Sequence, residues 1–160
     1  MRLVCPGPRP LGPLFALLAL LAGCVGAPGP AGPPDVDQAT FEALVYPILV
    51  RDCAFPACHG QAGRFLRVHG PGRSRLSEET ALSAPATDEE MTLAFERTRS
   101  MLASAESPEA SLLLRKPLEL DQGGAPHMGV DRFGRDVFAD TLDPAYLALL
   151  QWAGSQRGAP

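Results

Sequence analysis

The first apolar stripe with helical spacing begins near residue 39. Its members are Phe41, Leu44, Val45, Ile48 and Leu49. Pro47 interrupts the stripe, and a proline inside a helix costs about 3 kcal/mol. We therefore expect either a kink or a break, with Pro47 at the first position of a second short helix that leads into Cys53.

Helix-start signals predict three more helices. Thr87 and Glu90 form a capping box, and an apolar stripe follows it at Met91, Ala94, Phe95, Thr98 and Leu102. Ser107-Pro108 starts a short helix that Pro117 ends. The last helix starts at Asp143-Pro144, ends at Gly154, and is apolar at Tyr146, Leu149, Leu150 and Ala153.

Two segments between these helices are rich in glycine. Residues 60–86 read as a long loop, in which the alternation at 64–68 leaves one short strand pair open. Residues 121–140 hold a second such stretch around His127 and Met128. The pattern therefore predicts a mostly α fold with long loops.

The N-terminus has a different pattern. Arg2 and Arg9 precede an apolar run over residues 11–22. This run is shorter than a bilayer-spanning helix, which needs about 20 apolar residues. The run ends in Leu21-Ala22-Gly23-Cys24, which resembles the lipobox of bacterial lipoproteins. That resemblance implies cleavage after residue 23 and acylation of Cys24. The alternative is an ordinary secretory signal in which Cys24 is incidental.

Cleavage would leave 137 residues, enough for one modest domain. Residues 24–38 are rich in proline and glycine and read as a flexible tether, so the domain is expected at 39–160. Loss of Arg2 and Arg9 changes the formal net charge from −4 to −6. A mildly acidic body argues against a nucleic-acid partner. We also find no nucleophile elbow, metallohydrolase motif or phosphate loop, so an enzyme is the less favoured class.

Two cysteines remain in the expected domain, within the sequence Cys53-Ala54-Phe55-Pro56-Ala57-Cys58-His59-Gly60. A cysteine followed by Cys-His is typical of c-type haem attachment, with two thioethers and a proximal histidine. The usual spacing has two residues between the cysteines, whereas here there are four. Two added residues can bulge outward, and Pro56 favours such a turn.

Together with four other segments, this motif resembles the small cytochrome-c-like domains of bacterial exported proteins over about residues 40 to 154. The other matching segments are 45–49, 111–117, the region of His127, and 146–152. The resemblance implies a helical fold around one covalent haem c, with Cys53 and Cys58 as attachment sites and His59 as an iron ligand. It also implies electron transfer with redox partner proteins in the cell envelope.

The sixth iron ligand is expected in the second glycine-rich stretch. We favour His127, with Met128 as the alternative and His69 or an open position as outsiders. Because Val25 follows Cys24, an outer-membrane anchor is favoured over the inner membrane.

Two non-haem alternatives stay open. One is a structural or interaction lipoprotein with a Cys53–Cys58 disulfide, whose small loop would contribute on the order of 2 kcal/mol. The other is zinc bound by both cysteines and two of the three histidines, His59, His69 and His127. His69 and the arginines at 64, 67, 73 and 75 are most simply solvated loop residues, although the arginines would also suit haem propionates. Phe41, Tyr46 and Trp152 are expected in the core.

Overall fold

The structure, a computed structural model, describes residues 32–82, 85–131 and 133–155. The signal peptide expected at 1–23, the acylation site Cys24 and most of the tether lie outside this part of the chain. Within it, no helix is long and apolar enough to cross a membrane. The regular secondary structure of the described residues is helical, as predicted, and their only strand-like pairing is an isolated bridge between Leu118 and Phe138.

The first helical segment runs without interruption from Gln38 to Cys53. It consists of α2 (Gln38–Thr40), the π-helical η2 (Phe41–Val45), α3 (Tyr46–Ile48) and the π-helical η3 (Leu49–Cys53). Pro47 is the second residue of α3, so it does not break the segment. The wider π turn before it relieves the clash that a proline ring makes with the carbonyl four residues back.

The other helices follow their sequence signals. The capping box between Thr87 and Glu90 is present at the start of α4 (Asp88–Ser100). The Asp143 side chain caps α6 (Pro144–Gly154) by accepting from the N–H groups of Ala145 and Tyr146. Between them, α5 (Leu112–Arg115) begins later than predicted, because residues 108–110 form a turn, and it ends before Pro117.

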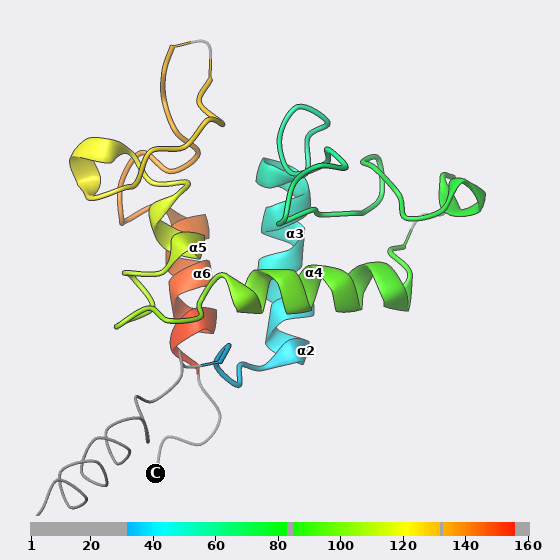
Figure 1. Cartoon of the computed structure of the whole chain (residues 1–160), viewed down its shortest axis with the longest axis horizontal. Helices are drawn as coiled ribbons and strands as arrows, with labels where there is room; N and C mark the ends of the chain where they lie inside the picture. Colours follow the sequence, from blue (N-terminus) through cyan, green and yellow to red (C-terminus); the bar gives the residue numbers. More distant parts are fainter. Residues whose placement is uncertain (1–31, 83–84, 132, 156–160) are drawn as a thin grey trace, which may run out of the picture. The chain divides into compact units, whose positions relative to one another are not determined.

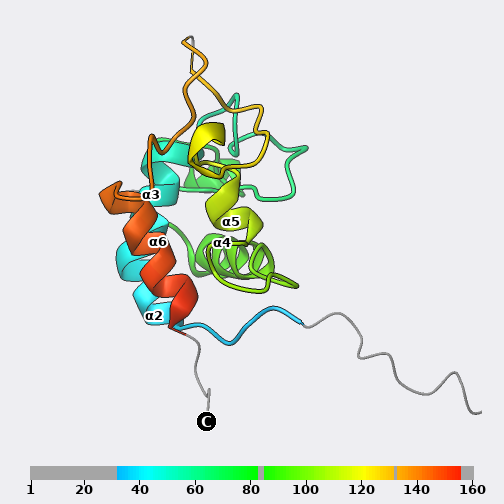
Figure 2. The same ribbon diagram turned by 90° about the vertical axis from the view of Figure 1, so that its left-hand side faces the viewer.

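The first helical segment and α6 lie side by side and antiparallel, and α4 crosses the first helical segment (Figures 1 and 2). The Trp152 indole N–H donates to the carbonyl of Asp37 at 2.9 Å, which joins the end of α6 to the start of α2. Val36, 2 % exposed, also packs into the core. The packed domain therefore reaches back into the segment expected to be tether.

An aromatic cluster fills the core where these helices meet. Phe41 lies 5.3 Å from Trp152 and 5.4 Å from Phe95, measured between ring centroids. Tyr46 packs against Phe41, and its hydroxyl donates to the carbonyl of His69 at 2.7 Å. These residues are buried, which confirms the core expected for Phe41, Tyr46 and Trp152.

A buried ion pair fixes the long loop to α4. Glu90 is fully buried, and its carboxylate accepts from the Arg75 guanidinium at 2.9 Å, from the Leu76 N–H and from the Thr87 N–H. Burial by itself would raise the pKa of Glu90, but the hydrogen bonds from Arg75 and the two N–H groups lower it to about 2. The carboxylate thus stays charged and joins two distant segments.

The long loop forms no strand pair in its described residues, and its only helical turn is η4 (Glu78–Thr80). Its carbonyl groups accept hydrogen bonds from side chains instead. Phe65 accepts from Arg97, Leu66 from His59 and His69 from Tyr46. Because these backbone carbonyl groups already accept hydrogen bonds from side chains, the alternating residues do not require a partner strand.

Two expectations for this loop are wrong. His69 is 3 % exposed and therefore is not a solvated residue. Arg75 is also not solvated, because its side chain is 5 % exposed in the pair with Glu90. Gly70 allows this packing, since a Cβ there would lie 2.7 Å from the Tyr46 hydroxyl.

Candidate functional site

The cysteine motif begins where the first helical segment ends. Cys53 is the last residue of η3, and Phe55, Pro56 and Ala57 bulge outward into solvent. The His59 N–H donates to the Cys53 carbonyl at 3.0 Å across this bulge. With two residues between the cysteines, the same pair of groups would be four positions apart and would make an ordinary helical hydrogen bond. Residues 55–57 are therefore extruded, and one backbone hydrogen bond closes the segment at their base.

Gly60 makes the closure sterically feasible. A Cβ at this position would lie 2.6 Å from the carbonyl oxygen of Ala54 and 2.9 Å from that of Phe55. The Gly60 N–H donates to the Phe55 carbonyl at 2.9 Å. The glycine after His59 thus has a specific packing reason, which the sequence motif alone does not explain.

The His59 ring is fixed by a hydrogen bond between its Nδ1 atom and the protein backbone. Its Nδ1 lies 2.6 Å from the carbonyl oxygen of Leu66, and a carbonyl can only accept, so Nδ1 carries the proton. The lone pair of Nε2 remains for a ligand. Burial lowers the pKa of His59 below its usual range, although the hydrogen bond to Leu66 acts in the opposite direction. The ring is therefore neutral, as a metal ligand must be.

The His127 ring is also fixed by a hydrogen bond of its Nδ1 atom, in this case to a side chain. Its Nδ1 lies 2.8 Å from a carboxylate oxygen of Asp136, whose side chain is 4 % exposed. The Asp136 N–H donates to the carboxylate of Glu119 at 2.8 Å. Gly129 lies against the ring, since a Cβ there would be 2.9 Å from the Cε1 atom of His127.

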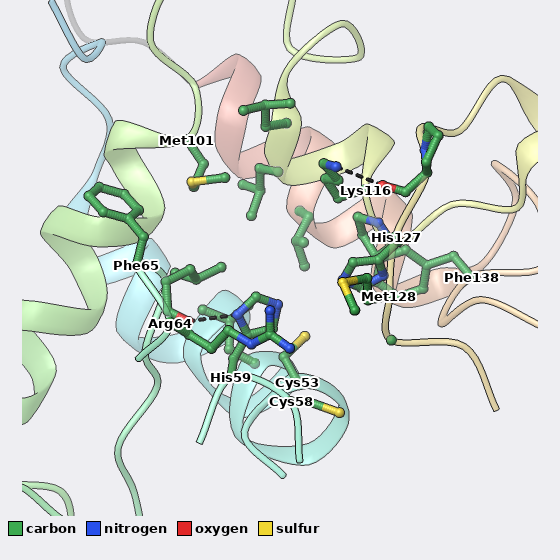
Figure 3. Close-up of a pocket in the computed structure, with 18 of the residues that line it drawn as sticks. Cys53, Cys58, His59, Arg64, Phe65, Met101, Lys116, His127, Met128 and Phe138 are labelled. Carbon is green, nitrogen blue, oxygen red and sulfur yellow. Dashed lines mark hydrogen bonds between the residues drawn. The ribbon is translucent and has the colours of Figure 1, made fainter. Parts of the chain in front are cut away.

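The two imidazoles line one cavity of about 320 Å³, with their ring centroids 6.1 Å apart and their planes inclined by 21°. Figure 3 shows them entering from different segments, His59 with the cysteines and His127 from the glycine-rich loop. The rest of the lining is mostly apolar and includes Leu49, Leu66, Leu113, Phe138 and Leu149. Both Cys53 and Cys58 also belong to the lining.

Cys53 and Cys58 are unbonded thiols in this structure. Burial raises the pKa of Cys53 to about 12, so this cysteine is a thiol and not a thiolate near neutral pH. No three His, Cys, Asp or Glu side chains within the described ranges come together as a metal-ion site. His69 lies in the cluster around Glu90 and Tyr46, so the zinc alternative loses one of its three histidines.

Some of the other residues predicted to contact a haem line the cavity, and others do not. Met128 contributes to the lining but is 87 % exposed, whereas the side chain of His127 is 17 % exposed. Arg64 also lines the cavity, but Arg73 donates to the Val50 carbonyl and Arg75 pairs with Glu90.

Three groups near the cavity were missed by sequence reasoning. Asp136 and the Leu66 carbonyl hold the histidines, and Lys116 donates to the Pro126 carbonyl at 2.6 Å beside His127. Asp136 is nine positions from His127 in a loop, so no periodic pattern relates them. A backbone carbonyl leaves no signal in a sequence at all.

No protein-family model, curated protein or solved structure matches this chain.

Proposed function

We propose that this protein is a monohaem c-type electron-transfer or redox module, tethered in the bacterial cell envelope by a lipid on Cys24. The observation that carries the proposal is the pair of half-buried imidazoles, His59 and His127, at one apolar cavity that Cys53 and Cys58 also line. Each ring uses Nδ1 for a protein acceptor and keeps Nε2 for a ligand.

The residues fit a haem iron in both chemistry and separation. A metal–imidazole bond is about 2 Å long, so two imidazoles on either side of one metal have ring centres roughly 6 Å apart. The 6.1 Å between His59 and His127 agrees with this value. A porphyrin would supply the remaining iron ligands, so two protein ligands would suffice, and within the described residues no cluster of three is present.

Covalent attachment would use Cys53 and Cys58. Each thioether forms when a cysteine S–H adds across a vinyl group of the haem, with the hydrogen going to the neighbouring carbon, so no oxidant is consumed. The haem would supply a one-electron couple. His59 and His127 would hold the iron, and the leucine-rich wall would limit its access to water, both of which affect the potential.

The sixth ligand in this proposal is His127 and not Met128. The ring of His127 is oriented by Asp136, whereas the Met128 side chain is 87 % exposed. Ligation by two histidines gives a lower potential than ligation by histidine and methionine. The module would therefore suit a low-potential step between partner proteins in the envelope, with the outer membrane favoured for the anchor.

The test is the absorption spectrum of the full-length protein made with a cytochrome-c maturation system that accepts the four-residue spacing. We expect a haem band that remains with the polypeptide after denaturation in excess thiol and disappears in a Cys53→Ser, Cys58→Ser double variant. Colourless protein with Cys53 bonded to Cys58 would instead establish the structural lipoprotein with a disulfide.

The ligand assignment is tested by His127→Ala with Met128→Ala as its matched neighbour. We expect His127→Ala to convert the iron to high spin and Met128→Ala to leave it six-coordinate and low spin. The reverse result would assign the iron to Met128.

The anchor is tested separately by Cys24→Ala. We expect this variant to accumulate as an unprocessed, unacylated precursor, because the signal peptidase for lipoproteins requires the cysteine. Soluble protein cleaved after residue 23 would show an ordinary secretory signal.

A further inference from the structure

We infer that Asp136 is a positioning residue that fixes the tautomer of His127 and strengthens its Nε2 as an electron donor. The expected effect of Asp136 on an iron ion rests on the proposed function. The hydrogen bond between Asp136 and His127 is present in the polypeptide itself. The Asp136 oxygen lies 2.8 Å from His127 Nδ1, and its side chain is 4 % exposed. A charge-assisted hydrogen bond of this kind is stronger than a neutral one.

Asp136 is itself held in place by two further contacts. Its backbone N–H donates to Glu119 Oε1 at 2.8 Å, and its Oδ1 also accepts from the Val137 N–H at 3.3 Å. The adjacent backbone is fixed as well, since the Phe138 N–H donates to the Pro117 carbonyl at 2.7 Å and the Phe138 carbonyl accepts from the Glu119 N–H at 3.0 Å. The carboxylate is thus directed at His127 by the framework around α5 and not by His127 alone.

The two histidines differ in the acceptor that holds them. The Nδ1 of His59 faces the neutral carbonyl of Leu66, whereas that of His127 faces a carboxylate. An anionic partner at Nδ1 raises the basicity of the ligating nitrogen, and loss of such a partner typically weakens metal binding about 10- to 100-fold. His127 is therefore the stronger donor of the pair, and it stabilises the more positive, oxidised iron.

The experiment compares Asp136→Asn with Asp140→Asn in the full-length, haem-loaded protein. Asn at 136 keeps an oxygen but removes the charge. Asp140 is an exposed carboxylate four positions away that accepts from the Leu142 N–H, and the variant makes the same change of net charge. We expect Asp136→Asn to raise the reduction potential and to make added imidazole about 10- to 100-fold more effective at displacing His127. Asp140→Asn should change neither quantity.

Equal potentials and equal imidazole competition in the two variants would overturn the inference. A second measurement covers an Asp136→Asn variant that fails to fold. In nitrogen NMR spectra of the unsubstituted protein prepared without haem, His127 should carry its proton on Nδ1, and a proton on Nε2 would overturn the inference.

The same NMR measurement separates this inference from the proposed function. Colourless protein would refute the haem. If His127 of that protein were still protonated on Nδ1, and lost this preference in Asp136→Ala, which removes the acceptor, but not in Asp140→Ala, the positioning role of Asp136 would stand without the haem.

Discussion

The aromatic core and the histidine cavity are formed by the same helices but are completed differently. In the core, Phe41, Phe95 and Trp152 pack ring against ring. At the cavity, Leu49 and Leu149 are just as buried but face a space of about 320 Å³. The helices therefore pack directly against one another in one region and line a cavity in the other.

Buried polar groups show the same contrast. Beside the core, Glu90 is saturated by Arg75 and two backbone N–H groups. At the cavity, His59 and His127 each use one ring nitrogen for a protein acceptor and keep the other. A metal-ligating histidine usually donates its other ring N–H to a carbonyl or a carboxylate, and both histidines of the cavity have such an acceptor.

The largest expected effect is the loss of the core aromatic ring in Trp152→Ala. The side chain is fully buried, so the cavity left behind should lower the free energy of unfolding by about 3–5 kcal/mol. Denaturant unfolding of the full chain measures this change. Leu147→Ala, on the same helix but 44 % exposed, should cost much less, and equal losses would contradict the core assignment.

Glu90→Gln should follow, with a loss of roughly 3 kcal/mol, because the buried Arg75 guanidinium would lose its charged partner. Glu89→Gln is the matched control, since Glu89 is exposed in the same helical turn. Unfolding midpoints of the two variants give the comparison.

The pH dependence sharpens this prediction. The pKa of Glu90 is lowered to about 2 in the folded state, so its contribution is complete above the unfolded value near 4.5 and falls as the pH drops towards 2. The stability difference between the original protein and Glu90→Gln should therefore shrink over that range. A difference that stays constant down to pH 2 would rule out the lowered pKa.

Two equally buried leucines, one of which lines the cavity, test how packing differs between the core and the cavity. Leu114 is fully buried away from the cavity, and Leu149 is equally buried but lines it. In protein without haem we expect Leu114→Ala to cost about 3 kcal/mol and Leu149→Ala about 2 kcal/mol, since a side chain facing a void has fewer packing contacts to lose. With haem bound, the order should reverse. The readout is the unfolding free energy of each variant with and without haem.

The smallest effect is expected for Thr87→Ala. It removes one acceptor of the capping box and should lower the free energy of unfolding by about 1 kcal/mol. Thr92→Ala, in the middle of the same helix, provides the comparison for losing a threonine without losing a cap. A similar change in both variants would show that the cap adds nothing beyond helix propensity.

Much of the helical framework was predictable because its signals are local. The capping box at Thr87 and the Asp143-Pro144 start each act within one turn, and both are present as expected. The backbone conformation at Pro47 was not predictable from the sequence, because a kink, a break and a π turn can each accommodate the missing N–H of a proline. The loop pattern at 64–68 was also misleading, since alternation shows which residues point inward but not whether a strand partner exists.

The sequence by itself determined most of the helix starts and ends, and the cysteines and histidine of the motif, because each depends on residues close together in the chain. Apolar spacing also predicted that Phe41, Tyr46 and Trp152 are buried, but not which rings they contact. Only the tertiary structure decided that His69 is buried near Glu90, that His127 lies 6.1 Å from His59, and that Asp136 holds its ring. These contacts join loop residues far apart in sequence or without periodic spacing. Their geometry is set by the packing of α5 and α6 against the first helical segment, which no local pattern encodes.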